Sequence, residues 1–209
     1  MTSSTGLANQ PGVHLVTERM VLRRFTTNDL DALVELDNDP EVMHYINNGA
    51  PVDADDVADT LDHWIAAYHR TPGFGFWAAD DRRTGDFIGW FHFRPAHYNI
   101  PPEPELGYRL RRNYWGRGLA TEGARALIDN GFEQHPIERV VAETMVVHTA
   151  SRRVMEKAGL RPTRTFRADW PVRIPGDEHG DVEYALTRND WKHQQRSMQS
   201  TSTESRNRH

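Results

Sequence analysis

The chain has 209 residues, a formal net charge of −5 at pH 7, a hydrophobic fraction of 37% and a charged fraction of 26%, which fits one globular domain with a sizeable core. The acidic balance argues against a protein that binds nucleic acid through a domain-wide basic field. Cysteine is absent, which excludes disulfides, thiolate zinc sites, iron–sulfur clusters and a cysteine nucleophile, and fits a reducing compartment.

The two ends of the chain differ in composition from the middle. Residues 1–12 are small and polar, and residues 193–209 contain one apolar residue, Met198, so we predict a disordered tail at each end. Residues 13–192 contain no flexible linker and no repeat, and we predict one domain there. The first residues lack the basic and apolar segments of a secretory signal, and no apolar run approaches the ~18 residues of a membrane span. A cytoplasmic location is therefore expected.

The first half of this domain alternates strand-like and helix-like segments. Residues 14–25 are rich in β-branched and apolar residues and are predicted to form a strand. Thr27 precedes apolar residues at helical spacing and is expected to cap a helix, and Asp53 is expected to cap a second one. Residues 74–79 and 87–93 flank a polar loop and are predicted to pair as a hairpin.

The second half begins with a strand over Glu105–Leu110. Its interior glycine, Gly107, indicates a bulge or a close approach of another group to the backbone. A helix is predicted over Gly118–Asn130, with its end at Asn130-Gly131. The remaining predicted elements are a strand at 139–145, a helix at 149–157, and strands at 160–166 and 182–186. This order predicts an α/β fold with a mixed, mostly antiparallel central sheet and flanking helices.

A glycine turn joins the strand that ends at Leu110 to the helix that follows. In Gly116-x-Gly118 the glycines allow positive φ and direct backbone N–H groups inward, and the helix N-terminus adds unpaired donors. The turn is therefore a candidate cradle for a phosphate or pyrophosphate. It lacks the Gly-Lys-Ser/Thr ending of a Walker loop, and Thr121 replaces the third glycine of a dinucleotide fingerprint. A purely structural glycine turn is the alternative.

Two sequence blocks together carry a family resemblance. Residues Gly107 through Glu122 match Gly-Tyr-x-Leu…Trp-Gly-x-Gly-x-Ala-Thr-Glu, and Ser151 with Glu156–Gly159 matches most of Asn-x-x-Ser…Glu-Lys-x-Gly-Phe. These blocks resemble the GNAT acyltransferases, and most of all the branch of ribosomal-protein serine/alanine N-acetyltransferases. The opening Thr17–Arg23 is similar to that branch too. The resemblance spans residues 13–192.

The resemblance implies acetyl-CoA as acyl donor and a splayed pair of strands that admits its pantetheine arm. The cofactor-binding residues that it implies are Leu110, Gly116, Arg117, Gly118, Leu119, Ala120, Thr121 and His148. The sequence also departs from the family pattern. Asn113 replaces the usual Gln or Arg, His148 the usual Asn, Leu160 the usual Phe, and Met155 a tyrosine that serves as the acid in some members.

Direct attack of an amine on a thioester needs a base for the amine and an acid for the leaving thiolate. Ser151 matches the family serine near the cofactor sulfur, and its alternative role is a local hydrogen bond in the first turn of a helix. Glu143 is the leading candidate for the base, and its alternative role is an ion pair on a strand face. Glu105 is the rival base, and Glu183 ranks below it.

The remaining candidate residues, the histidines and a row of aspartates, do not indicate a metal site. The histidines are scattered without ligand spacing, so no metal site is expected. Asp53, Asp56, Asp59 and Asp62 form either a solvated helix face or a steering surface for a cationic amine.

The sequence thus predicts an N-acyltransferase that moves acetyl from acetyl-CoA to a primary amine, either a protein N-terminus or a small amine. The alternative is an acyl-CoA-binding regulatory module without turnover. We expect a monomer or homodimer with no nucleic-acid or membrane partner.

Overall fold

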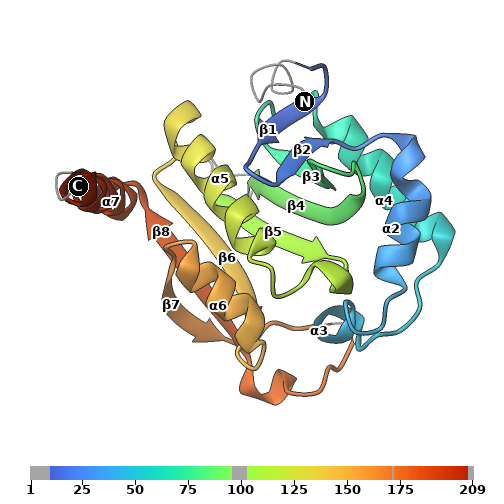
Figure 1. The fold of residues 1–209 in the computed structure, drawn as a ribbon. Helices are drawn as coiled ribbons and strands as arrows, with labels where there is room; N and C mark the ends of the chain where they lie inside the picture. The colour runs from blue at the N-terminus through green and yellow to red at the C-terminus, as the bar shows by residue number, and fades with distance from the viewer. Residues whose placement is uncertain (1–9, 96–102, 171, 207–209) are drawn as a thin grey trace.

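A computed structural model describes residues 10–95, 103–170 and 172–206. Its centre is an eight-stranded sheet in the order β1-β2-β3-β4-β5-β6-β8-β7 (Figure 1), in which β5 and β6 are the parallel neighbours and the other pairs are antiparallel. The predicted mixed, mostly antiparallel sheet is thereby confirmed. The strands are β1 Val13–Val16, β2 Met20–Arg24, β3 Gly75–Asp81, β4 Phe87–Pro95, β5 Pro104–Leu110, β6 Arg139–Met145, β7 Arg161–Phe166 and β8 Asp181–Thr187.

Helices cover both faces of the sheet (Figure 1). The α-helices are α2 Leu30–Asp37, α3 His44–Asn47, α4 Ala54–Ala67, α5 Leu119–Gln134, α6 Thr149–Lys157 and α7 Arg188–Arg206. Three short 3-10 turns complete the elements: η1 Thr27–Asp29, η2 Arg112–Tyr114 and η3 Asp177–His179. Asp53 caps α4 as predicted, because its carboxylate accepts from the Asp55 N–H at 2.8 Å.

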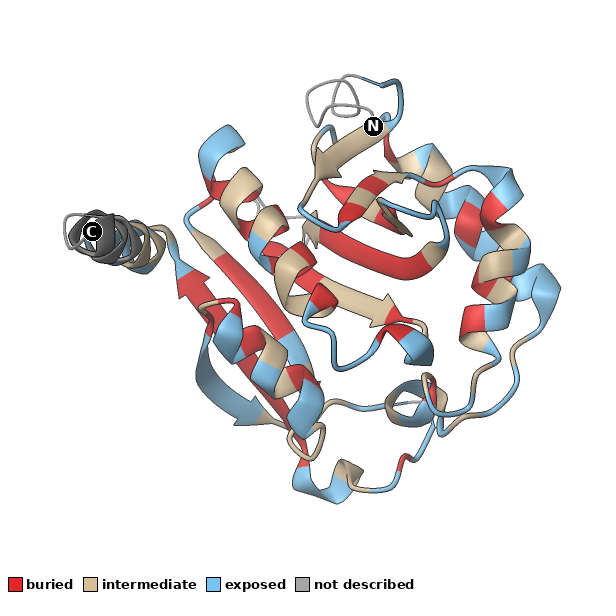
Figure 2. Ribbon diagram, in the orientation of Figure 1, coloured by how far each residue is buried: buried red, intermediate tan, exposed pale blue. Residues whose placement is uncertain are grey.

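The apolar core lies in two layers, one on each face of the sheet. The larger layer packs α5 and α6 against the central strands, and the smaller one packs α2 and α4 against β3 and β4. Figure 2 shows buried residues along the central strands and on the inner sides of these helices. Alternation along β4 illustrates the division, because Phe91 and Phe93 belong to the larger layer and Trp90 to the smaller.

The junction between β5 and β6 is the point where the sheet opens. One residue pair, Glu105 with Val141, joins these two strands, whereas β4 and β5 pair along their whole length. Of the two interpretations of Gly107, the bulge is wrong, since the β4–β5 register is regular there. Gly107 instead allows close approach: a Cβ at this position would lie 2.4 Å from the His92 ring. The two strands diverge beyond Glu105 without a bulge.

The N-terminal strand is broken into two. The sequence predicts a single strand over 14–25, but β1 and β2 form a hairpin with a turn at residues 17–19. The turn contains no glycine or proline and is closed by the Thr17 N–H, which donates to the Met20 carbonyl at 2.9 Å. The first helical cap also shifts by one residue, because Thr26, not Thr27, forms a capping box with Asp29.

One predicted helix end and one predicted tail differ from the structure. Helix α5 continues past Asn130 to Gln134. Gly131 is not a cap but a site of close packing, since a Cβ there would lie 2.6 Å from the Phe93 ring. The expected tail over 193–209 is helical through Arg206. Gln194 anchors this helix by donating to the Gly159 carbonyl at 3.0 Å, and polar side chains thus replace the apolar face that the sequence lacks. The expected tail over residues 1–12 lies, up to residue 9, outside the described residues.

Candidate active site

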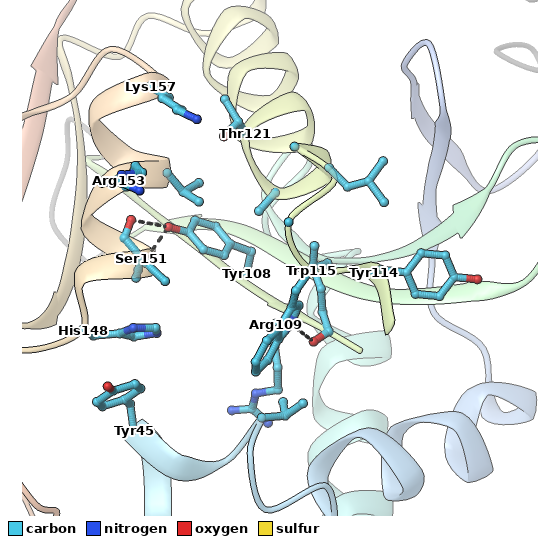
Figure 3. Close-up of a pocket in the computed structure, with 18 of the residues that line it drawn as sticks. Tyr45, Tyr108, Arg109, Tyr114, Trp115, Thr121, His148, Ser151, Arg153 and Lys157 are labelled. Atoms are coloured by element: carbon cyan, nitrogen blue, oxygen red, sulfur yellow. Dashed lines mark hydrogen bonds between the residues drawn. The ribbon is translucent and has the colours of Figure 1, made fainter. Parts of the chain in front are cut away.

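A cavity of about 390 Å³ lies between α3, the end of β5, the start of α5 and one side of α6 (Figure 3). Most of the residues implied as cofactor contacts line it: Leu110, Gly116, Gly118, Leu119, Ala120, Thr121 and His148. Ser151 lines it too, whereas Arg117, Glu143 and Glu105 do not. The structure therefore brings the glycine turn and the candidate acid together around one space, and leaves the candidate bases outside it.

The glycine turn has the geometry of an anion cradle. Gly116 and Gly118 adopt φ values of 73° and 79°, in the left-handed region that glycine favours. Gly118 is the N-cap of α5, so the N–H groups of the first helical turn lack intrahelical partners. A Cβ on Gly116 would meet nothing within 4 Å, so open space lies in front of the turn. This backbone fits the pyrophosphate of coenzyme A.

A cluster around Glu122 braces this turn against the β1–β2 hairpin. The Glu122 carboxylate accepts from the Thr17 hydroxyl at 2.6 Å, from the Arg19 N–H at 2.8 Å and from the Arg19 guanidinium at 2.6 Å. Arg19 also donates to the Arg117 carbonyl at 2.7 Å. Burial raises the pKa of Glu122, but the hydrogen bonds from Thr17 and Arg19 outweigh it and hold the pKa below its usual value.

The hydroxyl of Ser151 is held by a residue to which the sequence analysis assigned no role. Tyr108 reaches from β5 across the cavity, and its hydroxyl lies 3.0 Å from the Ser151 carbonyl oxygen and 3.1 Å from Ser151 Oγ (Figure 3). Burial raises the pKa of Tyr108 far above its usual value, so it is a neutral phenol. The signal in the sequence is its place in the Gly-Tyr-x-Leu block, directly after Gly107.

His148 forms another wall of the cavity. Its ring stacks on Tyr45 of α3, with ring centroids 4.1 Å apart (Figure 3). Burial, with the nearby His44, lowers the pKa of His148 to about 4, so the ring is neutral near pH 7. The family's asparagine is thus replaced by another neutral polar group. Sequence reasoning missed α3 and Tyr45, because this four-residue helix is too short to show a period.

The candidate bases lie on the other face of the sheet. Glu143 alternates with Ala142, which packs in the layer beneath α5 and α6, so its side chain points away from that layer. Burial, reinforced by Glu105 and Glu183, raises the pKa of Glu143. Its ion pair with Arg164 is long, at 3.7 Å. Glu143 is therefore a loosely held carboxylate two residues beyond the last β5–β6 pair.

The two rival carboxylates are more tightly held. Arg94 donates to Glu105 at 2.7 Å, and His92 Nε2 lies 3.6 Å from the same carboxylate. Glu183 is buried. Burial raises the pKa of Glu183, but hydrogen bonds from Thr163, Arg164 and Arg139 outweigh it and lower the pKa. Glu183 therefore belongs to a structural ion-pair network.

The resemblance places the pantetheine arm of the coenzyme against the backbone around Leu110, and this position stays a prediction. The Leu110 carbonyl already accepts from the Trp115 indole N–H at 2.8 Å.

In the parts of the chain that the structure describes, no three His, Asp or Glu side chains are grouped so that they could hold a metal ion. No helix among the same residues is long and apolar enough to cross a membrane.

Comparison with known proteins gives the family. Residues 19–161 match the acetyltransferase (GNAT) domain. A similar protein, the FsC-acetyl coenzyme A-N(2)-transacetylase of Aspergillus fumigatus, is 33% identical over 193 residues, which cover 90% of this chain and 80% of that protein.

Solved structures agree in fold. A GNAT acetyltransferase from Bacillus anthracis has a TM-score of 0.69 at 25% identity and covers 84% of this chain and 98% of its own. A ribosomal-protein α-N-acetyltransferase in complex with coenzyme A has a TM-score of 0.71 at 18% identity, over 84% of this chain and 97% of its own, which shows the fold alone. The match over residues 19–161 agrees with the glycine turn at the start of α5 and with the open β5–β6 junction. The chain therefore belongs to the GNAT family of N-acetyltransferases.

Proposed function

We propose that this enzyme transfers acetyl from acetyl-CoA to a primary amine by direct attack, with Ser151 as the acid and Glu143 as the base. The observation that carries the proposal is the position of Ser151, whose side chain lines the same cavity as the glycine turn. A coenzyme whose pyrophosphate sits on Gly116–Thr121 extends its thioester along this cavity toward α6. His148 and Tyr45 close the other end of the cavity.

The proposed chemistry assigns each proton to a group. The acceptor ammonium approaches through the open β5–β6 junction from the face that carries Glu143 and gives one proton to that carboxylate, and the neutral nitrogen attacks the thioester carbon. The C–N bond forms, the C–S bond breaks, and the thiolate takes the Ser151 proton. The second proton that the nitrogen loses on becoming an amide restores the serine hydroxyl, so one proton is released in total through Glu143. A raised pKa suits Glu143 for this work near neutral pH.

The acceptor is proposed as a small amine or a protein N-terminus. The Aspergillus fumigatus relative is named an acetyl coenzyme A-N(2)-transacetylase, which we take as acetylation of a numbered nitrogen of a compound. A solved structure of similar fold is said to modify the N-terminal serine of a ribosomal protein. Relatedness is greater for the first, at 33% identity against 17%. Small molecules that carry a primary amine are therefore the first acceptors to test, and N-terminal peptides follow.

The test is a thiol-release assay with acetyl-CoA and a panel of small amines and N-terminal peptides. Release of coenzyme A that depends on the amine, with an acetylated product of the expected mass, supports the proposal. Tight coenzyme binding by calorimetry without thiol release for any amine would contradict it, and would favour the alternative of an acyl-CoA-binding regulatory module. A Ser151→Ala variant measured in parallel assigns the proton donor.

A further inference from the structure

We propose that Tyr108 is a positioning residue that sets the direction of the Ser151 hydroxyl proton. The inference rests on the proposed function, because it concerns the acid of that reaction. Tyr108 enters from β5 and Ser151 from α6, so their contact spans the open β5–β6 junction (Figure 3). Among the described residues, no hydrogen-bond partner other than Tyr108 is seen for Ser151 Oγ.

The contact allows two proton arrangements. In the first, Tyr108 donates to the Ser151 carbonyl at 3.0 Å, and Ser151 Oγ–H donates to the phenol oxygen at 3.1 Å. The serine proton then points at Tyr108 and away from an incoming sulfur. In the second, Tyr108 donates to Ser151 Oγ, and the serine proton is left to point into the cavity. Each hydroxyl has one proton, so the two arrangements exclude one another.

Catalysis needs the second arrangement. As the C–S bond breaks, negative charge grows on sulfur, and only a proton directed at the sulfur stabilises it. A phenol that donates to Ser151 Oγ also stabilises the charge that the serine oxygen gains as its proton leaves, because chained hydrogen bonds strengthen one another. The partly buried phenol keeps its own proton, since removal from solvent raises its pKa. Tyr108 therefore acts through Ser151 and touches no reacting atom in the proposal.

Packing against the core makes Tyr108 fit for this positioning. The ring packs against the larger core layer and lies 6.1 Å from Phe91 between centroids. A rigid ring fixes the hydroxyl in space, and a fixed donor costs no reorganisation during the reaction. Removal of the hydroxyl by Tyr108→Phe preserves the packing of the ring. The variant therefore separates hydrogen bonding from core stability.

The experiment is a double-mutant cycle with Tyr108→Phe, Ser151→Ala and the double variant, in the thiol-release assay. We expect Tyr108→Phe to lower kcat about tenfold and to leave KM for acetyl-CoA within about twofold. Ser151→Ala should lower kcat by about 10²-fold, and adding Tyr108→Phe to it should change kcat little further, because both act through one proton. Tyr68→Phe, which removes a buried hydroxyl outside the cavity, should retain the wild-type kcat.

The outcomes separate this inference from the proposed function. A wild-type kcat in Tyr108→Phe, with Ser151→Ala still impaired, would overturn the positioning role and leave Ser151 as the acid. An undiminished effect of Tyr108→Phe in the Ser151→Ala background would overturn it as well, because Tyr108 would then act without the serine. A wild-type kcat in Ser151→Ala would remove the acid from the proposed function and this inference with it. Melting temperatures and coenzyme affinities of all variants identify a simple folding defect.

Discussion

Replacing Glu122 by glutamine should weaken both the fold and the coenzyme site. The carboxylate joins the β1–β2 turn to the first turn of α5 through Thr17 and Arg19. A glutamine can still accept from Thr17, but its amide N–H₂ faces the Arg19 guanidinium, and the charge is lost. Hydrogen bonds to charged groups contribute about 1.5–3 kcal/mol each when shielded. The Arg19 side chain is 45% exposed, so solvent screens the pair with Arg19.

We therefore expect Glu122→Gln to lower the free energy of unfolding by about 1.5 kcal/mol. For a chain of this length, that change lowers Tm by about 3–6 °C. The affinity for coenzyme A should fall severalfold, because Arg19 also holds the Arg117 carbonyl and so the glycine turn. Calorimetry of unfolding and of coenzyme binding measures both effects. The matched control is Glu35→Gln, which removes an ion pair with Arg111. The Glu35 side chain is 71% exposed, so this variant should change Tm little.

The pH dependence of the same variant follows from the lowered pKa of Glu122. A carboxylate with a folded pKa below its usual 4.5 stabilises the fold above that value, and the stabilisation is lost as pH falls through the folded pKa. The difference in Tm between wild type and Glu122→Gln should therefore be full at neutral pH and shrink below about pH 4.5. Equal melting temperatures and equal coenzyme affinities at pH 7 would refute the bracing role of Glu122.

Four further substitutions test other parts of the molecule. Gly118→Val forces a β-branched residue into φ 79° at the start of α5, and we expect coenzyme A affinity to fall at least about tenfold; unchanged binding by calorimetry in a folded variant would show that the cradle is misplaced. Glu143→Gln should lower kcat/KM and remove the acidic limb of the pH profile of kcat/KM. In the wild type this limb should lie above the usual pKa of a glutamate, because burial raises the pKa of Glu143. Glu105→Gln should do so much less, and the reverse ranking would make Glu105 the base. Gly107→Ala should destabilise the fold by about 1–3 kcal/mol in urea unfolding, because its Cβ would lie 2.4 Å from the His92 ring; an unchanged midpoint would mean that the ring moves freely.

Local sequence signals predicted the elements that are determined by interactions between residues close together in the chain. The glycine turn, helix α6 and the strands around the cavity followed from glycine positions and apolar spacing, and the structure places them together. The helix α4 followed from its cap and its period. These features depend on residues within a few positions of one another, so one sequence is enough to read them.

Features made by distant contacts were missed. The turn after β1 has no turn residue, and Glu122, more than a hundred residues away, holds it in place. Helix α7 lacks an apolar face after Trp191 and is anchored by Gln194 and Gln195 on Gly159 and Asp129. The pairing of Tyr108 with Ser151 joins β5 to α6. None of these contacts leaves a local pattern, because each side chain is ordinary in its own segment.

The open junction between β5 and β6 has a consequence for the cohesion of the molecule. The strands β1–β5 and the strands β6–β8 form two half-sheets, joined directly by the pair Glu105–Val141 and by the ion pair of Arg139 with Glu103 at 2.8 Å. Beyond that pair, the β5 and β6 backbones lack each other as hydrogen-bond partners. A pantetheine arm bound there, as the proposed function expects, would act through its two amides as a surrogate strand between the halves. Amide hydrogen exchange along residues 106–110 and 142–145 should slow when coenzyme binds, and the two half-sheets should unfold more cooperatively in its presence.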